Sequence, residues 1–461
     1  MANDSHASQP RRGWLQRLTS SEGIFARAMR GSLVVAGAYA FSQLLRLVSN
    51  LILARVLFPE AFGLMALVTV ATTGLQLLSD IGITQAIAQH RRGDEPAFLD
   101  TAFTINVARG VVLWLGSCAL AYPMALFYDA PDLARLIPVA GLAFVIAGFV
   151  PTKMDAAVRN LQLVRLTLLD LVANVIGVVS TVVLAIVTRS VWSLIFALII
   201  SNAAKVVLMR VWLPGHRNRF GWDREAAHDL IHFGKWIFLS TSCYFLLMQG
   251  DKMVLGAYLN LAELGTYNIG YFLGSFPALL AAAVASRVMV PLYRDRPSEG
   301  AAALQYERKI RRMRYALSGA ILGALAVMAF FGIPIVGLLY SESYAPAGPV
   351  VVLVACVQMI TAFGVTYDQS ALAAGDSRGI FHVTALRAAF QTAGLWLGFE
   401  AAGLAGALAG QAAGLLLVHA AVAMLARKHR AWDPTHDLVF IGASGALAAL
   451  AIGWNAGALR F

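Results

Sequence analysis

Apolar stretches of about 20 to 28 residues recur along the chain, each followed by a short polar break. A helix that crosses the hydrocarbon core of a bilayer needs about 20 mainly apolar residues, so each stretch is a candidate transmembrane helix. A thirteenth and last stretch is expected at 437–457. The first twelve lie at 32–55, 61–83, 101–127, 133–151, 166–187, 191–213, 235–258, 264–291, 315–340, 349–373, 380–400 and 403–426.

Composition excludes a soluble enzyme. Of the 461 residues, 59% are hydrophobic and 13% are charged, whereas soluble domains carry about 45–50% apolar and about 25% charged residues. The polar breaks are too short to hold a separate soluble domain. The sequence therefore predicts an all-α polytopic membrane protein with about 12–13 transmembrane helices, and any function must reside among those helices.

The 36 Lys and Arg exceed the 25 Asp and Glu and give a net charge of +11, which could indicate nucleic-acid binding. Most of these cations fall in the N-terminal tail and in every second break after it. Because basic loops stay in the cytoplasm, the pattern predicts a cytoplasmic N-terminus and excludes nucleic acid as a partner. No signal peptide is recognisable in the first thirty residues. The alternate breaks hold only Arg55, Arg135, Arg189 and Arg460.

The two halves of the chain align weakly, which indicates an internal duplication. Leu53–Gly63 (LARVLFPEAFG) matches Leu255–Gly265 (LGAYLNLAELG), and both segments contain a helix end, a short loop and the start of the next helix. The duplication predicts two pseudo-symmetric six-helix bundles around a central cavity. The expected regions are a cytoplasmic tail at 1–31, a bundle at 32–213, a cytoplasmic linker at 214–234, a bundle at 235–426, and a loop with an additional helix at 427–461.

Three segments resemble a known family. Residues 53–92 (LARVLFPEAFGLMALVTVATTGLQLLSDIGITQAIAQHRR), 155–166 (DAAVRNLQLVRL) and 249–280 (QGDKMVLGAYLNLAELGTYNIGYFLGSFPALL) are similar to polysaccharide flippases of the multidrug/oligosaccharidyl-lipid/polysaccharide exporter superfamily. Within it, the chain looks closer to exopolysaccharide and O-antigen repeat-unit exporters than to lipid II flippases or multidrug antiporters. Many members carry about 12 to 14 helices, so a chain with thirteen departs from an even count.

The resemblance implies a multi-pass protein of the bacterial inner membrane. Its substrate would be an undecaprenyl-pyrophosphate-linked oligosaccharide, which it would move from the cytoplasmic to the periplasmic leaflet by alternating access. A polysaccharide polymerase and export machinery would be its partners besides the lipid bilayer. An ion-coupled multidrug antiporter and a lipid II flippase remain the alternatives within the superfamily. Several Arg in the spans favour an anionic substrate over an organic cation.

Charged residues inside the spans are the candidate functional residues, because a charge at the bilayer centre costs about 2.5–3.5 kcal/mol unless it faces water or a partner. Arg46 and Asn50 lie on a polar stripe of the first span, and a guanidinium suits a pyrophosphate. The alternative for Arg46 is pairing with an acidic neighbour for packing. The predicted substrate-binding residues are Arg46, Asn50, Arg109, Tyr267, Tyr271 and Arg387.

The predicted coupling or gating residues are Asp80, Asp251, Lys252 and Asp368. Asp80 can cap a helix or pair with Arg109, and pairing would give Arg109 a structural role. Successive helix positions point about 100° apart, so Asp251 and Lys252 are not expected to share a face. Tyr267 and Tyr271 could stack on sugar rings or pack in the core.

Nothing in the sequence predicts catalysis or a cofactor. There is no GxxxxGK[ST] loop and no HExxH motif. A membrane glycosyltransferase or polymerase would need a large extramembrane loop with an acidic cluster, which the chain lacks. We therefore expect a protein that is not an enzyme and binds no metal, and whose energy source could be a proton or sodium gradient.

Overall fold

The computed structural model describes residues 24–459, apart from 81, 161 and 298, and shows helices without strands in this part of the chain. Residues 1–23 of the predicted tail and Arg460 lie outside the described residues. The first half contains α2 (Ile24–Val56), α3 (Pro59–Leu78), α4 (Ile83–Gln89), α5 (Pro96–Phe127), α6 (Leu133–Gly148), α7 (Lys153–Arg159), α8 (Leu163–Thr188) and α9 (Trp192–Trp212). The second half contains α10 (Arg224–Leu255), α11 (Leu261–Arg294), α12 (Ala301–Leu339), the 3-10 helix η1 (Glu342–Tyr344), α13 (Ala347–Ala373), α14 (Ser377–Lys428) and α15 (Pro434–Trp454).

Short polar breaks set the helix boundaries. Pro59 begins α3 at a position where the missing N–H of proline costs nothing. Asn260 and Glu263 form a reciprocal capping box at the start of α11. Non-helical backbone at Ala402 and Gly403 divides α14 into two legs, at the break predicted between the eleventh and twelfth spans. Every stretch predicted from the sequence is therefore occupied by helix, including the thirteenth, which is α15.

Two helices extend beyond the predicted spans. α10 begins at Arg224, so the second part of the predicted linker 214–234 is helical. Ala226, Ala227 and Leu230 in this part of α10 are buried against α4 and α5. α12 begins at Ala301, before the predicted span 315–340.

Nine described helices are long and apolar enough to span a membrane, and α6 with α7 makes a tenth candidate bent by 63°. The long helix α14 counts once among them although it has two legs. Neither α2 nor α10 is among them, although each has more than 30 residues. Polar residues lower the mean hydropathy of both helices, so we expect part of each helix to face other segments of the protein or water.

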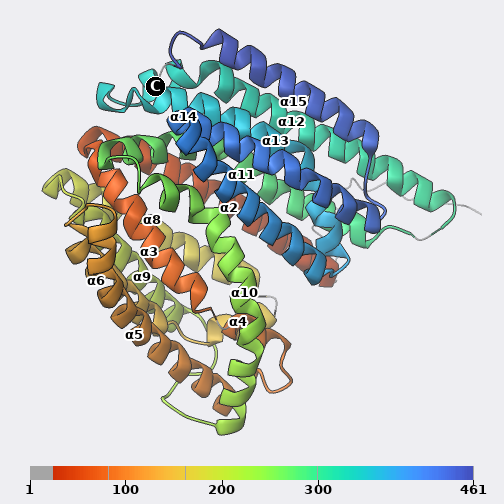
Figure 1. Cartoon of the computed structure of the whole chain (residues 1–461). Coiled ribbons are helices and arrows are strands. Elements are labelled where there is room, and N and C mark those ends of the chain that lie inside the picture. Colours follow the sequence, from red (N-terminus) through yellow and green to blue (C-terminus); the bar gives the residue numbers. More distant parts are fainter. Residues whose placement is uncertain (1–23, 81, 161, 298, 460–461) are drawn as a thin grey trace, which may run out of the picture.

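The spans give the molecule two chemically different ends. We call the end that carries the α9–α10, α11–α12 and α14–α15 connections, with their Arg and Lys, the basic end, and the end that carries η1 the opposite end. Figure 1 shows that α5, α6, α8 and α9 form one group and α12 to α15 another, and that the groups diverge towards the basic end, with α2 and α10 between them. The last helix, α15, ends at the opposite end.

The core that joins the two groups lies towards the opposite end. The Tyr344 hydroxyl donates to the Leu57 carbonyl over 2.7 Å, and the Tyr128 hydroxyl donates to the Met253 carbonyl over 3.2 Å. An apolar cluster around Tyr344 includes Phe62 and Ile269 from α3 and α11. These contacts link the halves at the end where the groups in Figure 1 converge.

The docked linker fastens α10 to the first half at the basic end. Arg92 forms ion pairs with Asp223 over 2.7 Å and Glu225 over 2.9 Å. Asp100 at the start of α5 lies 2.8 Å from His216. The base of α10 is thus held by α4 and α5, while its other end packs against α3 and α14. α10 therefore connects the two groups along its length.

Two glycines form a reciprocal close contact where α3 crosses α11. A Cβ atom on Gly63 would overlap the carbonyl oxygen of Leu261, and one on Gly265 would overlap the carbonyl oxygen of Pro59. The alignment of the halves pairs Gly63 with Gly265 and Pro59 with Leu261. Equivalent residues thus make equivalent contacts, as a two-fold relation between the halves requires. This observation supports the internal duplication.

Substituting either glycine is expected to destabilise the protein. Gly63→Ala and Gly265→Ala each place a methyl group against backbone that cannot rotate away, and overpacking of this kind costs about 1–3 kcal/mol. Thermal unfolding in detergent should show a lower midpoint for both variants. Gly319→Ala in α12 is the matched control, because its Cβ meets nothing within 4 Å. Midpoints equal to wild type for Gly63→Ala and Gly265→Ala would contradict the close contact.

Asp155 in α7 is a buried acid at the basic end, beyond the bend that separates α7 from the span α6. Burial raises the pKa of its carboxyl from 3.8 to about 6, although the Thr84 hydroxyl donates to Oδ1 over 2.7 Å. The folded state therefore binds this proton more tightly than the unfolded chain does. It follows that the folded protein loses stability as the pH rises from about 4 through about 6.

Asp155→Asn is expected to raise the unfolding midpoint at about pH 7.5, where the wild-type carboxylate costs up to about 3 kcal/mol. The gain should shrink at about pH 5, because the wild-type acid is then mostly protonated. Asp94→Asn, at an acid that is 58% exposed, is the control and should show no such pH dependence. An equal gain at both pH values, or none at pH 7.5, would contradict the buried acid.

Candidate functional site

Six Lys and Arg lie in or near the spans, and the structure gives most of them a partner. Lys205 forms an ion pair with Asp170 over 2.9 Å. Arg387 on α14 binds Asp368 on α13 through both carboxylate oxygens, over 2.8 and 3.0 Å. A bidentate pair of this kind neutralises both groups. The predicted substrate ligand Arg387 and the predicted gate Asp368 are therefore brought together in the second half.

Arg109 has a structural position. Its guanidinium donates to the carbonyls of Ser79 and Gln76 over 2.9 Å each, and also to the Ser79 hydroxyl. These carbonyls end α3, and a cation there satisfies groups that lack a partner within the helix. Asp80 accepts from the backbone N–H of Gly82 just before α4, and among the described residues it forms no ion pair with Arg109 within 4 Å. Arg109 holds the end of α3, since the free carbonyls of a helix terminus attract a cation.

Asp251 and Lys252 contact each other directly, so the expectation that they cannot share a face was wrong. The Lys252 ammonium lies 3.1 Å from Oδ2 of Asp251, and both side chains are almost wholly buried. A lysine stem is long enough to fold back on its neighbour. The Tyr267 hydroxyl donates to Asp251 over 3.0 Å, and the ammonium lies 4.7 Å from the centroid of the Tyr271 ring.

This arrangement gives the two tyrosines a role in the core. Tyr267 is 0% exposed, so its ring cannot stack on a sugar in this conformation. Tyr271 is partly buried beneath the lysine. Both rings surround a buried ion pair, which is costly to break because a lone charge would remain. Asp251, Lys252, Tyr267 and Tyr271 therefore form one unit that connects α10 to α11.

Arg46 and Arg287 are the two remaining cations, and both lie between α2 and α11. Among the described residues no carboxylate lies within ion-pair distance of either guanidinium. The Arg46 guanidinium lies 5.1 Å from the centroid of the Phe272 ring, and that of Arg287 lies 5.8 Å from the Tyr39 ring. An aromatic face offers a cation far less than a carboxylate does. These two Arg retain the capacity to bind an anion.

The surroundings of Arg46 fit a polar ligand. Its side chain is exposed, and Asn50, one turn further along α2, is partly exposed. Gln43 on the same stripe donates to the Tyr39 hydroxyl over 3.2 Å. The stripe predicted from the sequence is therefore present, and it is directed at α11. Bidentate guanidinium groups bind phosphate oxygens well.

Arg287 is not among the substrate-binding residues predicted from the sequence. Nothing on α11 distinguishes it, because Arg287 lies near the basic end where Arg is common. Its ring partner Tyr39 comes from a helix more than 200 residues away in the sequence. The polar stripe on α2, which also includes Tyr39, is the signal that could have found it. A polar helix face must meet another polar surface, and Arg287 supplies part of that surface.

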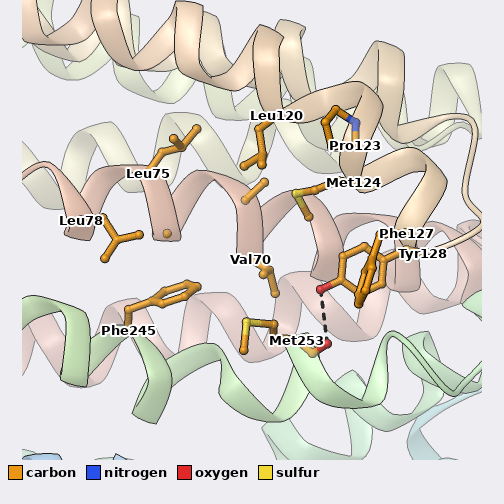
Figure 2. A pocket seen from close by; sticks show the side chains of 12 residues that line it. Val70, Leu75, Leu78, Leu120, Pro123, Met124, Phe127, Tyr128, Phe245 and Met253 are labelled. Carbon is orange, nitrogen blue, oxygen red and sulfur yellow. Dashed lines mark hydrogen bonds between the residues drawn. The ribbon is translucent and has the colours of Figure 1, made fainter.

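An apolar pocket of about 450 Å³ lies between α3, α5 and α10 (Figure 2). The Tyr128 hydroxyl bond to the Met253 carbonyl closes one end of it. No charged side chain lines it, so it suits a hydrocarbon chain and not a charged headgroup. Its lining residues are Val70, Ala71, Gly74, Leu75, Leu78, Leu120, Pro123, Met124, Phe127, Tyr128, Phe245 and Met253.

No group of three His, Cys, Asp or Glu side chains within residues 24–459, apart from the gaps named above, is placed to hold a metal ion. At the α2–α11 interface, the side chains that contact the Arg46 and Arg287 guanidinium groups are the aromatic rings of Phe272 and Tyr39.

Thermal stability should separate Arg109, which has hydrogen-bond partners in α3, from Arg46, which has no carboxylate partner. Arg109→Met removes the hydrogen bonds that hold the end of α3 and is expected to cost about 1–3 kcal/mol. Arg46→Met removes a cation without a carboxylate partner and should leave the unfolding midpoint unchanged or raise it. The midpoints are measured side by side in the same detergent. A large loss for Arg46→Met would show that Arg46 has a structural partner.

Curated relatives share sequence with this chain. The succinoglycan biosynthesis transport protein ExoT of Rhizobium meliloti (strain 1021) is 24% identical over 318 residues, which are 68% of this chain and 62% of the relative. The lipopolysaccharide biosynthesis protein WzxC of Escherichia coli (strain K12) is 23% identical over 330 residues, 69% of this chain and 64% of the relative. The match thus spans less than two thirds of the length of either relative.

Solved structures share the fold. The lipid II flippase MurJ in an inward closed conformation superimposes with a TM-score of 0.65 at 10% identity, over 93% of this chain and 100% of that chain. A multidrug resistance MATE family transporter of the MOP superfamily, in an inward-facing conformation, gives 0.59 at 17% identity, over 88% and 95%. A family model described as polysaccharide biosynthesis protein matches residues 52–349. The chain therefore belongs to this polysaccharide biosynthesis protein family and has the fold of MOP-superfamily transporters.

Proposed function

We propose that this protein flips a polyprenyl-pyrophosphate-linked oligosaccharide from the cytoplasmic to the periplasmic leaflet of the bacterial inner membrane, for exopolysaccharide or O-antigen export. The observation that carries the proposal is a pair of guanidinium groups between α2 and α11. Arg46 on α2 contacts Phe272 on α11, and Arg287 on α11 contacts Tyr39 on α2. Neither guanidinium has a carboxylate partner among the described residues. Membership of a polysaccharide biosynthesis family and relatives named for succinoglycan and lipopolysaccharide biosynthesis support a saccharide cargo.

The charge distribution supports an orientation. With the basic end in the cytoplasm, most Arg and Lys in the connections lie on the inner side, as positive loops do. The N-terminus is then cytoplasmic and the C-terminus, at the end of α15, is periplasmic. Residues 32–213 and 235–426 form the two pseudo-symmetric bundles of the transporter, and the reciprocal contact of Gly63 and Gly265 supports this division.

Alternating access follows from where the halves touch. Hydrogen bonds and the glycine crossing join them at the opposite end, while the two groups diverge towards the basic end (Figure 1). A headgroup arriving from the cytoplasm would meet Arg287 first, because it lies nearer the basic end of α11, and then Arg46. Rocking about the α3–α11 crossing would expose Arg46 to the other side. The polyprenyl chain stays in lipid, and the apolar pocket between α3, α5 and α10 suits part of it.

Two Arg at different depths serve this movement, because an anion in a low-dielectric path needs a counter-charge at each position it occupies. Neither Arg is neutralised in advance by an acid, so neither must break an ion pair to bind the pyrophosphate. A proton or sodium gradient, or polymerisation of the repeat unit outside the membrane, would give the movement its direction. The polymerase and the export machinery are then the partners that consume the product.

Arg46→Ala is expected to abolish export while folded protein remains in the membrane. The measurement is polysaccharide release by a strain in which the variant replaces the wild-type gene, with membrane levels measured by immunoblot. Arg135→Ala, at an exposed position in the first turn of α6, is the matched control and should export normally. Normal export by Arg46→Ala would remove the main site from the proposal.

Ligand specificity separates the alternatives within the superfamily. Purified protein should be stabilised against heat by undecaprenyl pyrophosphate more than by undecaprenol, since only the former carries the anion that Arg46 and Arg287 bind. Arg287→Ala should reduce the stabilisation. Preference for a lipophilic drug cation would favour an antiporter, and a response to lipid II alone would favour a lipid II flippase.

A further inference from the structure

A buried cluster of polar residues lies where α12, α13, α14 and α15 meet near the basic end. At its centre, Asp437 on α15 accepts from the Tyr367 hydroxyl over 2.7 Å and from the Trp432 indole N–H over 2.9 Å. Nε2 of His419 on α14 lies 3.2 Å from Oδ2 of Asp437. Asp437 is 8% exposed, so its charge is held by these contacts and not by water.

The second histidine of the cluster is engaged differently. His436 is 0% exposed, its Nε2 lies 3.0 Å from the Ser318 hydroxyl, and its Nδ1 lies 3.3 Å from the Tyr367 hydroxyl. Both ring nitrogens therefore already have partners. One buried carboxylate can balance about one buried cation, so His419, which lies closer to Asp437 than His436 does, is the group that can gain a charge.

The other charged groups around the cluster are already compensated. Arg314 stacks on the Tyr367 ring at 4.8 Å and lies 3.7 Å from Asp433, which also pairs with Arg311 over 3.2 Å. Asp368 is held by Arg387. The titratable and charged groups that face the cluster are Tyr293 from α11, Arg311, Arg314 and Tyr315 from α12, Tyr367 and Asp368 from α13, Arg387, His419 and Arg427 from α14, and Asp433, His436 and Asp437 at the start of α15.

Gly364 links this cluster to Arg387. A Cβ atom on Gly364 would lie 3.9 Å from Nδ1 of His419 and 4.0 Å from Nη2 of Arg387. The two nitrogens are therefore at most about 8 Å apart. In the tautomer in which Nε2 donates to Asp437, Nδ1 can accept a proton, and the added positive charge would lie within that distance of Arg387.

We propose that His419 and Asp437 form a proton-binding site, and that one proton taken up at Nδ1 of His419 is linked electrostatically to anion binding at Arg387. The added charge repels Arg387 and favours its transfer from Asp368 to an anion. By reciprocity, an anion at Arg387 strengthens proton binding at His419. The link to transport rests on the proposed function, whereas the proton site itself does not.

Trp432 provides an internal reporter, because its indole and His419 contact the same carboxylate oxygen. The tryptophan fluorescence of the full-length protein in nanodiscs should change in a single transition as the pH is varied. Trp432→Phe and His419→Gln should each remove this transition. His382→Gln, at an exposed position on the same helix, should leave it unchanged. A transition that persists in His419→Gln would overturn the proposed site.

The linkage is tested with sulfate, an anion that does not itself titrate in the pH range of the scan. Sulfate at constant ionic strength should raise the midpoint in wild type, because an anion at Arg387 favours the protonated form of the His419–Asp437 pair. Arg387→Gln should lose the sulfate shift but keep the transition. No shift in wild type would overturn the linkage. If the wild-type protein shows no fluorescence transition and Arg46→Ala fails to export, the transport proposal stands and only the proton site falls.

Discussion

Uncompensated charge within the bilayer is the constraint on which the rest of this structure depends. Four of the six cations in or near the spans are neutralised or fixed: Lys205, Lys252 and Arg387 by acids, and Arg109 by the end of α3. Only Arg46 and Arg287 are left with aromatic rings. A charge retained in this way at a cost of a few kcal/mol supports the proposed anion site between α2 and α11.

The geometry of the halves explains how such a site could be exposed to either side. Gly63 and Gly265 let α3 and α11 approach until backbone meets backbone, and they do so at equivalent positions of the aligned halves. The buried unit of Asp251, Lys252 and Tyr267 ties α10 to α11 beside this crossing. A rigid crossing at one end, with groups that diverge at the other, is suited to rocking without unfolding either half.

Hydropathy and charge periodicity predicted the fold well, because a membrane imposes the same length and polarity on each span. The positions of all thirteen helical stretches followed from it, and so did the stripe that contains Arg46. Hydropathy and charge periodicity could not predict contacts between helices that are far apart in the sequence. Nothing local to Arg109 indicates that it binds the end of α3, and the pair of Arg287 with Tyr39 joins α11 to α2. The contact between Asp251 and Lys252 escaped because helical phase describes where a side chain starts, while a lysine stem is free to bend.

The most direct test of the account is a structure of the full-length protein in nanodiscs with undecaprenyl pyrophosphate bound. The account predicts density for the pyrophosphate between α2 and α11, within hydrogen-bond distance of the Arg46 or Arg287 guanidinium. Whether Arg387 is paired with Asp368 or released from it should depend on the pH. Pyrophosphate density elsewhere in the molecule, with Arg46 and Arg287 still stacked on Phe272 and Tyr39, would contradict it.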